Sequence, residues 1–92
     1  MTNTWPNKDP DEVLDYSIDW SAQMAADGDT IASAEWIVPA ELTKGAEVVT
    51  GNIVTVWLSG GTAARSHFVT SRITTTAGRV MDRSARLLIT NL

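Results

Sequence analysis

Few side chains in this sequence have the chemistry that catalysis needs. The 92 residues include no cysteine, which excludes thiolate nucleophiles, thiolate metal sites and disulfide bonds. The one histidine, His67, lies in a segment that predicts a strand, and the sequence has no Gly-x-Ser-x-Gly nucleophile elbow. No serine, histidine and acid are spaced as in a recognisable triad. We therefore expect that the chain is not an enzyme.

Acids gather near the start of the chain, at Asp9, Asp11 and Glu12. The Asp9-Pro10-Asp11 segment has part of the spacing of a calcium loop, but the glycine of the sharp turn and the bidentate glutamate at the twelfth position are missing. Gly60-Gly61 could lie close to a phosphate, but no P-loop lysine follows. The sequence therefore predicts solvated acids and a flexible turn, with no metal ion and no cofactor.

Charge is distributed unevenly along the chain, whose net charge is −4. Residues 1–47 hold ten acids against two lysines, whereas residues 48–92 hold one acid against five arginines. The net charge argues against nucleic acid as a partner. The asymmetry is either a solvated surface or a complementary pair of docking faces.

No membrane partner is expected. No apolar stretch approaches the roughly 20 residues of a membrane span, and no signal peptide is recognisable. We expect synthesis in the cytoplasm.

The first twelve residues, MTNTWPNKDPDE, predict an extended arm outside the fold. Two prolines, two asparagines and four charged residues leave no apolar period in them. Trp5 lies outside any pattern and either packs against the domain or inserts into a partner. Residues 13–92 are too few for two cores, so they predict a single β domain.

Strict alternation of apolar and polar residues predicts the first strand of that domain, from Leu14 to Trp20. Residues 13–26 could also form a helix, but the alternation and the aromatic content favour the strand. A second strand is predicted over Thr30–Val38, and a short edge strand near Glu47–Val49. Ile53–Leu58, IVTVWL, predicts a central strand.

A long hairpin is predicted to end the chain, with strands His67–Thr75 and Arg79–Ile89 around a three-residue turn. Pairing Thr75 with Arg79 places apolar residues opposite apolar ones along the whole hairpin. The same register sets two outward pairs, Arg72 with Asp82 and Phe68 with Arg86. It also turns Arg83 inward, a misfit that suggests a bulge near Asp82.

These elements predict an all-β, immunoglobulin-like sandwich of about seven short antiparallel strands with an extended N-terminal arm. Short strands separated by turns about ten residues apart are typical of sandwiches and small barrels. A tryptophan on a central strand and a final long hairpin favour the immunoglobulin-like arrangement. Because the usual disulfide is absent, packing around Trp36 and Trp57 is expected to replace it. Every tryptophan except Trp5 falls on a predicted core face.

Several short segments, taken in order, resemble small tail proteins of tailed bacteriophages and prophages, described as fibre–tail adaptor or tail accessory proteins. The segments are Trp5-Pro6, Lys8-Asp9-Pro10-Asp11-Glu12, Leu14-Asp15-Tyr16, Asp19-Trp20, Gly28-Asp29-Thr30-Ile31, Trp36, Val56-Trp57-Leu58-Ser59-Gly60-Gly61, Arg72-Ile73-Thr74-Thr75, Gly78-Arg79 and Asp82-Arg83-Ser84. The resemblance covers nearly the whole chain and is weakest over Ala40–Asn52. It implies a virion structural protein of the tail that docks onto other tail proteins and has no catalytic residues.

The candidate protein contacts are charged or aromatic residues that the predicted core does not use: Trp5, Lys8, Asp9, Asp11 and Glu12 on the arm, and Arg72, Arg79 and Arg86 on the hairpin. Their expected partners are other phage tail proteins, or further copies of the chain in a ring or a stack. The alternative function is a stand-alone β-sandwich that binds glycan or a cell surface, since the fold itself does not decide between them.

Overall fold

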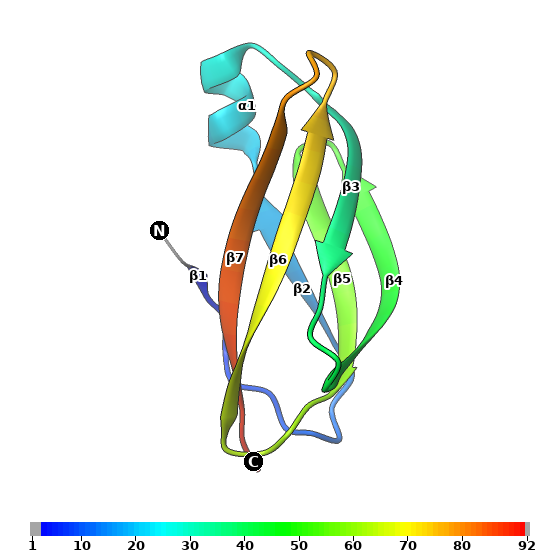
Figure 1. The fold of residues 1–92 in the computed structure, drawn as a ribbon, viewed down its shortest axis with the longest axis vertical. Coiled ribbons are helices and arrows are strands. Elements are labelled where there is room, and N and C mark those ends of the chain that lie inside the picture. Colours follow the sequence, from blue (N-terminus) through cyan, green and yellow to red (C-terminus); the bar gives the residue numbers. More distant parts are fainter. Residues whose placement is uncertain (1–2, 92) are drawn as a thin grey trace.

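Seven strands and one short helix make up residues 3–91, the part of the chain that the computed structural model describes (Figure 1). The elements are β1 (Asn3–Thr4), β2 (Leu14–Asp19), α1 (Ser21–Asp27), β3 (Ile31–Ile37), β4 (Leu42–Thr50), β5 (Ile53–Gly60), β6 (Arg65–Thr75) and β7 (Val80–Ile89).

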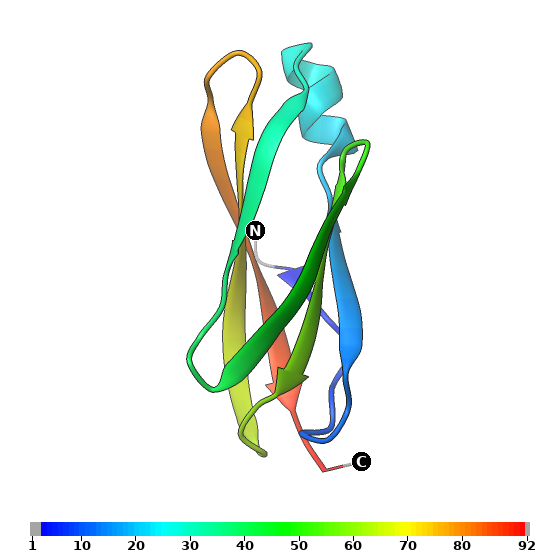
Figure 2. The same ribbon diagram turned by 90° about the vertical axis from the view of Figure 1, so that its right-hand side faces the viewer.

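The strands form two sheets, which face each other in Figure 2. One sheet has the order β1-β7-β6-β3 and the other the order β2-β5-β4. The second, fifth and fourth strands thus form one layer and the third, sixth and seventh the other, as in immunoglobulin domains. β1 pairs in parallel with β7 instead of joining β2, and the other pairings are antiparallel. The predicted fold class is confirmed.

The predicted register of the final hairpin is also confirmed. β6 and β7 pair Ile73 with Met81 and Arg72 with Asp82, and the Thr75 amide donates to the Arg79 carbonyl. β7 pairs without a register shift at Arg83, so the suggested bulge is wrong. The inward Arg83 guanidinium instead lies 4.3 Å from the ring of Trp20, a cation–π contact.

Aromatic rings fill the space between the sheets. Trp5 stacks on Tyr16 with ring centroids 4.7 Å apart and lies 6.0 Å from Trp36. At the other end of the core, the Trp20 indole donates to the buried Ser71 hydroxyl at 3.2 Å. These contacts take the place of the disulfide that the fold usually has.

The helix α1 differs from the favoured interpretation, which gave residues 13–26 a strand and kept a helix as the alternative. Alternation does hold from Leu14 to Asp19, and the helix-favouring segment Ala22–Ala26 follows it. Met24 is buried and attaches the helix to the core. Gly28 ends it in the left-handed conformation (φ 61°), where its amide donates back to the last turn.

Two elements in the middle of the chain differ from expectation. β4 has nine residues, although only a short edge strand near Glu47–Val49 was expected. β5 is the predicted central strand, but Val54, Val56 and Leu58 are its buried residues, so Trp57 points outward. The prediction that Trp57 packs in the core is therefore wrong.

The N-terminal segment is extended, but it does not lie outside the fold. β1 pairs with β7, the Lys8 amide donates to the Leu88 carbonyl, and the Thr90 amide donates to the Lys8 carbonyl. An extended strand can add to a free sheet edge whatever its apolar period, and this is why the sequence pattern gave no sign of it. Residues 1 and 2 of the predicted arm and residue 92 of the predicted domain lie outside the described part.

Candidate docking surfaces

Two candidate contacts of the N-terminal segment are buried within the chain. Trp5 belongs to the core, with 9% of its surface exposed. The Lys8 side chain is fully buried, and its ammonium donates to the carbonyls of Asp9 (2.9 Å) and Gly60 (2.8 Å). Burial lowers the pKa of Lys8, against the opposing effect of Glu12 and other nearby carboxylates. Trp5 and Lys8 therefore join the sheets and are not available to a partner.

The three acids of the segment form a tight turn. The Asp9 amide donates to the Glu12 carboxylate, and the Glu12 amide donates back to the Asp9 carbonyl. The Asp11 amide donates to the Asp9 carboxylate at 2.8 Å. The acids thus satisfy the backbone of the turn, an arrangement that favours Asp at its first position. Asp11 remains exposed and stays a candidate contact.

The arginines of the hairpin have different surroundings. Arg72 makes two hydrogen bonds to Asp82, at 2.8 and 2.9 Å, and a longer ion pair with Glu35. Arg79 pairs with Asp29 at 2.8 Å. Arg86, opposite Phe68, is exposed and has no carboxylate partner within residues 3–91.

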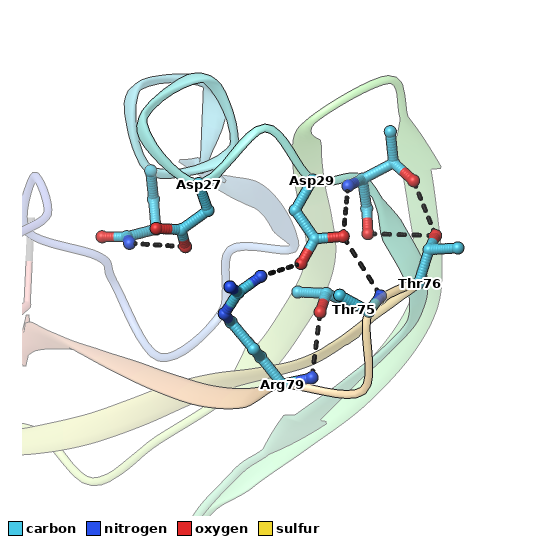
Figure 3. Close-up of polar contacts among 8 residues, drawn as sticks. Asp27, Asp29, Thr75, Thr76 and Arg79 are labelled. Carbon is cyan, nitrogen blue, oxygen red and sulfur yellow. Dashed lines mark hydrogen bonds and ion pairs between the residues drawn. The ribbon is translucent and has the colours of Figure 1, made fainter.

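The Asp29 carboxylate locks the hairpin turn to the loop after α1 (Figure 3). It accepts hydrogen bonds from the Thr30 and Ala77 amides and from Arg79, and only 4% of its side chain is exposed. Hydrogen bonding, chiefly from the Thr75 hydroxyl, lowers the pKa of Asp29 from 3.8 to about 2, although burial opposes the shift. The open depression beside it is lined by Gly28, Asp29, Thr30, Thr76 and Ala77. The hydrogen bonds of the Asp29 carboxylate thus join the loop after α1 to the hairpin turn.

The outer face of the β2-β5-β4 sheet carries large apolar side chains in water. Its large apolar side chains are Trp57, Ile53 and Val48, of which Trp57 and Ile53 are each 39% exposed and Val48 is 46% exposed. Cross-strand pairing places Asp15 beside Trp57 and Asp19 beside Ile53. We call this surface, formed by Asp15, Asp19, Val48, Ile53 and Trp57, the Trp57 face.

A β-bulge in β4 lies opposite Trp57 and leaves only small residues beside its ring on that strand. Lys44 pairs with Leu58 and Glu47 with Val56, so two residues, Gly45 and Ala46, lie opposite Trp57. They are the smallest side chains available, and a Cβ on Gly45 would already lie 3.4 Å from that of Trp57. Bulges often re-aim a side chain at a functional surface.

The outer face of the β1-β7-β6-β3 sheet also exposes apolar groups. Phe68 is 56% exposed, and Ile37 and Val80 are exposed as well. The Arg72–Asp82 pair crosses the middle of this surface, and Glu35 approaches it from β3. We call it the Phe68 face, formed by Glu35, Ile37, Phe68, Arg72, Val80, Asp82 and Arg86.

The remaining residues that the sequence singled out for chemistry, His67 and the Gly60-Gly61 pair, have structural surroundings. His67 is buried, and its Nε2 accepts a long hydrogen bond of 3.5 Å from the Thr62 amide. Between residues 3 and 91, no three His, Asp or Glu side chains are grouped as metal ligands, and no helix has the length and apolarity to cross a bilayer. Gly61 has a φ of 105°, and a Cβ at this position would lie only 2.7 Å from the Ile89 side chain. Glycine is therefore required here by the backbone conformation and by the close contact with Ile89.

Comparison with protein families shows to which family the chain belongs. The family model described as "Podophage GP4 fiber-tail adaptor protein gp77" matches residues 8–88. The chain belongs to this family. The match begins at the buried Lys8 and runs to residue 88 in β7, so it covers nearly the whole sandwich. It confirms the resemblance to phage fibre–tail adaptors. No curated protein sequence matches the chain.

The family is one of structural adaptor proteins of phage tails, which agrees with the virion structural role that the sequence predicts. Sequence reasoning missed Trp57 as a surface residue. The available signal was Thr55, a polar residue that shares a face with Trp57 on an otherwise apolar strand.

Proposed function

We propose that this chain is a non-enzymatic component of the phage tail that docks onto other tail proteins and thereby connects fibre to tail. The observation that carries the proposal is the family match over residues 8–88. Synthesis in the host cytoplasm would precede incorporation into the tail.

The geometry is suited to an adaptor. The sandwich is locked at one end by Asp29 and along one side by Lys8, so it can hold two partners at a fixed separation. Its core is closed, yet each sheet leaves large apolar side chains on its outer face. Exposed apolar groups that the core does not need are typical of protein contacts. Trp57 and Phe68, on opposite faces, are therefore the central residues of the two proposed contact surfaces.

Deletion of the gene from its phage, followed by mass spectrometry of purified particles, tests this function. Wild-type particles should contain the chain together with the tail proteins. Particles made without it should have tails but a strongly reduced content of fibre protein, and a plasmid copy of the gene should restore the fibres. The proposal is wrong if wild-type particles lack the chain, or if deletion leaves fibre content unchanged.

One observation favours a second candidate function, glycan binding. Trp57 lies half-exposed on the outer face of its sheet beside Asp15, and an indole with a neighbouring carboxylate can hold a sugar ring. Titration of tryptophan fluorescence with host surface glycans separates the two functions. The adaptor role predicts no saturable change, and a saturable change that Trp57→Phe alters would favour the glycan.

A further inference from the structure

The Trp57 face has charges that the fold leaves uncompensated. The Asp15 carboxylate makes no hydrogen bond or ion pair within residues 3–91, and the Asp19 carboxylate is hydrogen-bonded by Ser21, whose amide donates to it at 2.8 Å. No lysine or arginine belongs to the outward rows of β2, β5 and β4. The one cation of these strands, Lys44, points to the other side, where its ammonium donates to the Trp36 carbonyl.

The acids of this face lie on the edge strand β2, directly beside the apolar side chains of β5. Asp15 is the cross-strand neighbour of Trp57, and Asp19 that of Ile53, with the hydrogen-bonded Ser17–Thr55 pair between them. A surface that covers Trp57 must therefore also cover at least one carboxylate. Removing a carboxylate from water is unfavourable unless a cation or another donor meets it.

We propose that the Trp57 face is the docking site for a cationic, apolar surface of another tail protein, with aliphatic or aromatic groups on Trp57 and Ile53 and lysine or arginine on Asp15 and Asp19. The assignment rests on the proposed adaptor function and adds to it which face is used and the chemistry of the partner. Such a contact has an aromatic residue at its core and polar groups at its rim, as protein interfaces usually do.

A second copy of the chain fits the Trp57 face less well than a different protein. The chain's own Phe68 face holds Arg72, but this guanidinium is already engaged by Asp82 and Glu35. Arg86 is then the one cation left on the Phe68 face to meet two carboxylates. A different protein with two available cations satisfies the charges that a second copy would leave unpaired.

Binding of the purified full-length chain to two probes, the purified fibre protein and the purified tail protein of the same phage, tests the assignment. Trp57→Ala should weaken binding to one probe by about 30-fold or more, as at an energetic centre of an interface. Phe68→Ala, the matched control on the opposite face, should leave binding to that probe unchanged. Far-UV circular dichroism and thermal unfolding of each variant establish that it folds.

The salt dependence of binding provides a readout that does not require an aromatic truncation. The double variant Asp15→Asn/Asp19→Asn keeps the shape of the face and the acceptor for Ser21, and removes both charges. Wild-type affinity should fall as salt rises from about 0.05 to 0.5 M, and the double variant should bind more weakly with a much flatter dependence.

The outcomes separate the assignment from the proposed function. Binding of one probe that is unaffected by Trp57→Ala and equally salt-dependent in the double variant overturns the assignment and leaves the adaptor function standing. Loss of all binding in Phe68→Ala alone moves docking to the other face and also overturns it. Self-association of the wild type that Trp57→Ala abolishes identifies the occupant as a second copy, contrary to the proposal. If the wild type binds neither probe, the adaptor function itself fails.

Discussion

The outer faces of the two sheets are built from similar residues but use their charges differently. On the Phe68 face, Arg72 is held by Asp82 and Glu35, so the charges there are mostly neutralised within the chain. On the Trp57 face, Asp15 and Asp19 border an apolar centre, and no cation of the sheet faces them. Both faces expose a large aromatic ring.

The comparison of the two faces distinguishes charged groups that form ion pairs within the chain from charged groups that a partner could pair with. The sequence places ten of its eleven acids in its first half and all five arginines in its second, which fits either a solvated surface or two oppositely charged faces. In the described residues, two ion pairs join acids of the first half to arginines of the second, Asp29 with Arg79 and Glu35 with Arg72. Two of the acids that have no ion pair within residues 3–91, Asp15 and Asp19, lie on β2 and share the outer face of its sheet.

The largest effect should separate an interior tryptophan from a surface one. Trp5→Ala should lower the free energy of unfolding by about 3–5 kcal/mol, because it removes a ring that stacks on Tyr16 between the sheets. Trp57→Ala should lower it by less than about 1 kcal/mol, since Trp57 lies outside the core. Urea unfolding of both variants measures the contrast. Equal losses would mean that the Trp57 face is part of the stabilising core.

Lys8→Met should have an intermediate effect. Methionine fills a similar volume but donates no hydrogen bond, so the Gly60 carbonyl loses its partner at 2.8 Å. The expected loss is about 1–3 kcal/mol of unfolding free energy. Met24→Leu, a buried change that removes no hydrogen bond, is the control. Unchanged stability in Lys8→Met would show that this lysine does not tie the N-terminal segment to β5.

The Asp29 lock should give the chain a specific sensitivity to acid. Because the folded pKa of Asp29, about 2, lies below its ordinary value of 3.8, the ionised carboxylate stabilises the fold above pH 3.8. That stability should be lost as pH falls from about 4 to 2. Near pH 7, the melting temperature of Asp29→Asn should lie below that of the wild type by a constant amount. This gap should become smaller as pH falls from about 4 to 2. A gap in melting temperature that does not change with pH would show that the ionised Asp29 carboxylate does not stabilise the fold.

Substitutions that remove charges from the two outer faces should change the free energy of unfolding least. A double-mutant cycle with Arg72→Gln and Asp82→Asn should reveal a small coupling that weakens with added salt, because both groups are exposed. Asp15→Asn should leave stability unchanged or raise it slightly, since Asp15 has no cation to lose within the described chain. A clear loss on Asp15→Asn would show that the acids of the Trp57 face also serve the fold.

Much of the fold could be predicted because alternation and register are local properties. The hairpin register follows from matching the apolar side chains of two neighbouring segments across a three-residue turn, and the structure confirms it. The first strand was equally clear until Asp19, but the following helix was not, since Met24 in α1 continues the alternate apolar spacing of the strand.

The candidate contacts were harder to predict because burial depends on residues distant in sequence. Lys8 is buried by the ends of β5 and β7, more than 50 positions away, and nothing next to it in the sequence indicates this. Trp57 has apolar neighbours on both sides along the chain, so only its pairing with Asp15 and the bulge at Gly45 shows that it faces outward. Of the predicted contacts, the exposed Asp11 and Arg86 remain on the surface without an ion pair in the described residues.

Hydroxyl-radical footprinting of the free chain and of purified virions, read by mass spectrometry, tests most directly whether the Trp57 face is the one that is covered. Trp57 should be oxidised in the free chain and protected at least several-fold in virions, with Trp20, buried in both states, as the internal reference. Equal oxidation of Trp57 in the free chain and in virions would contradict the account.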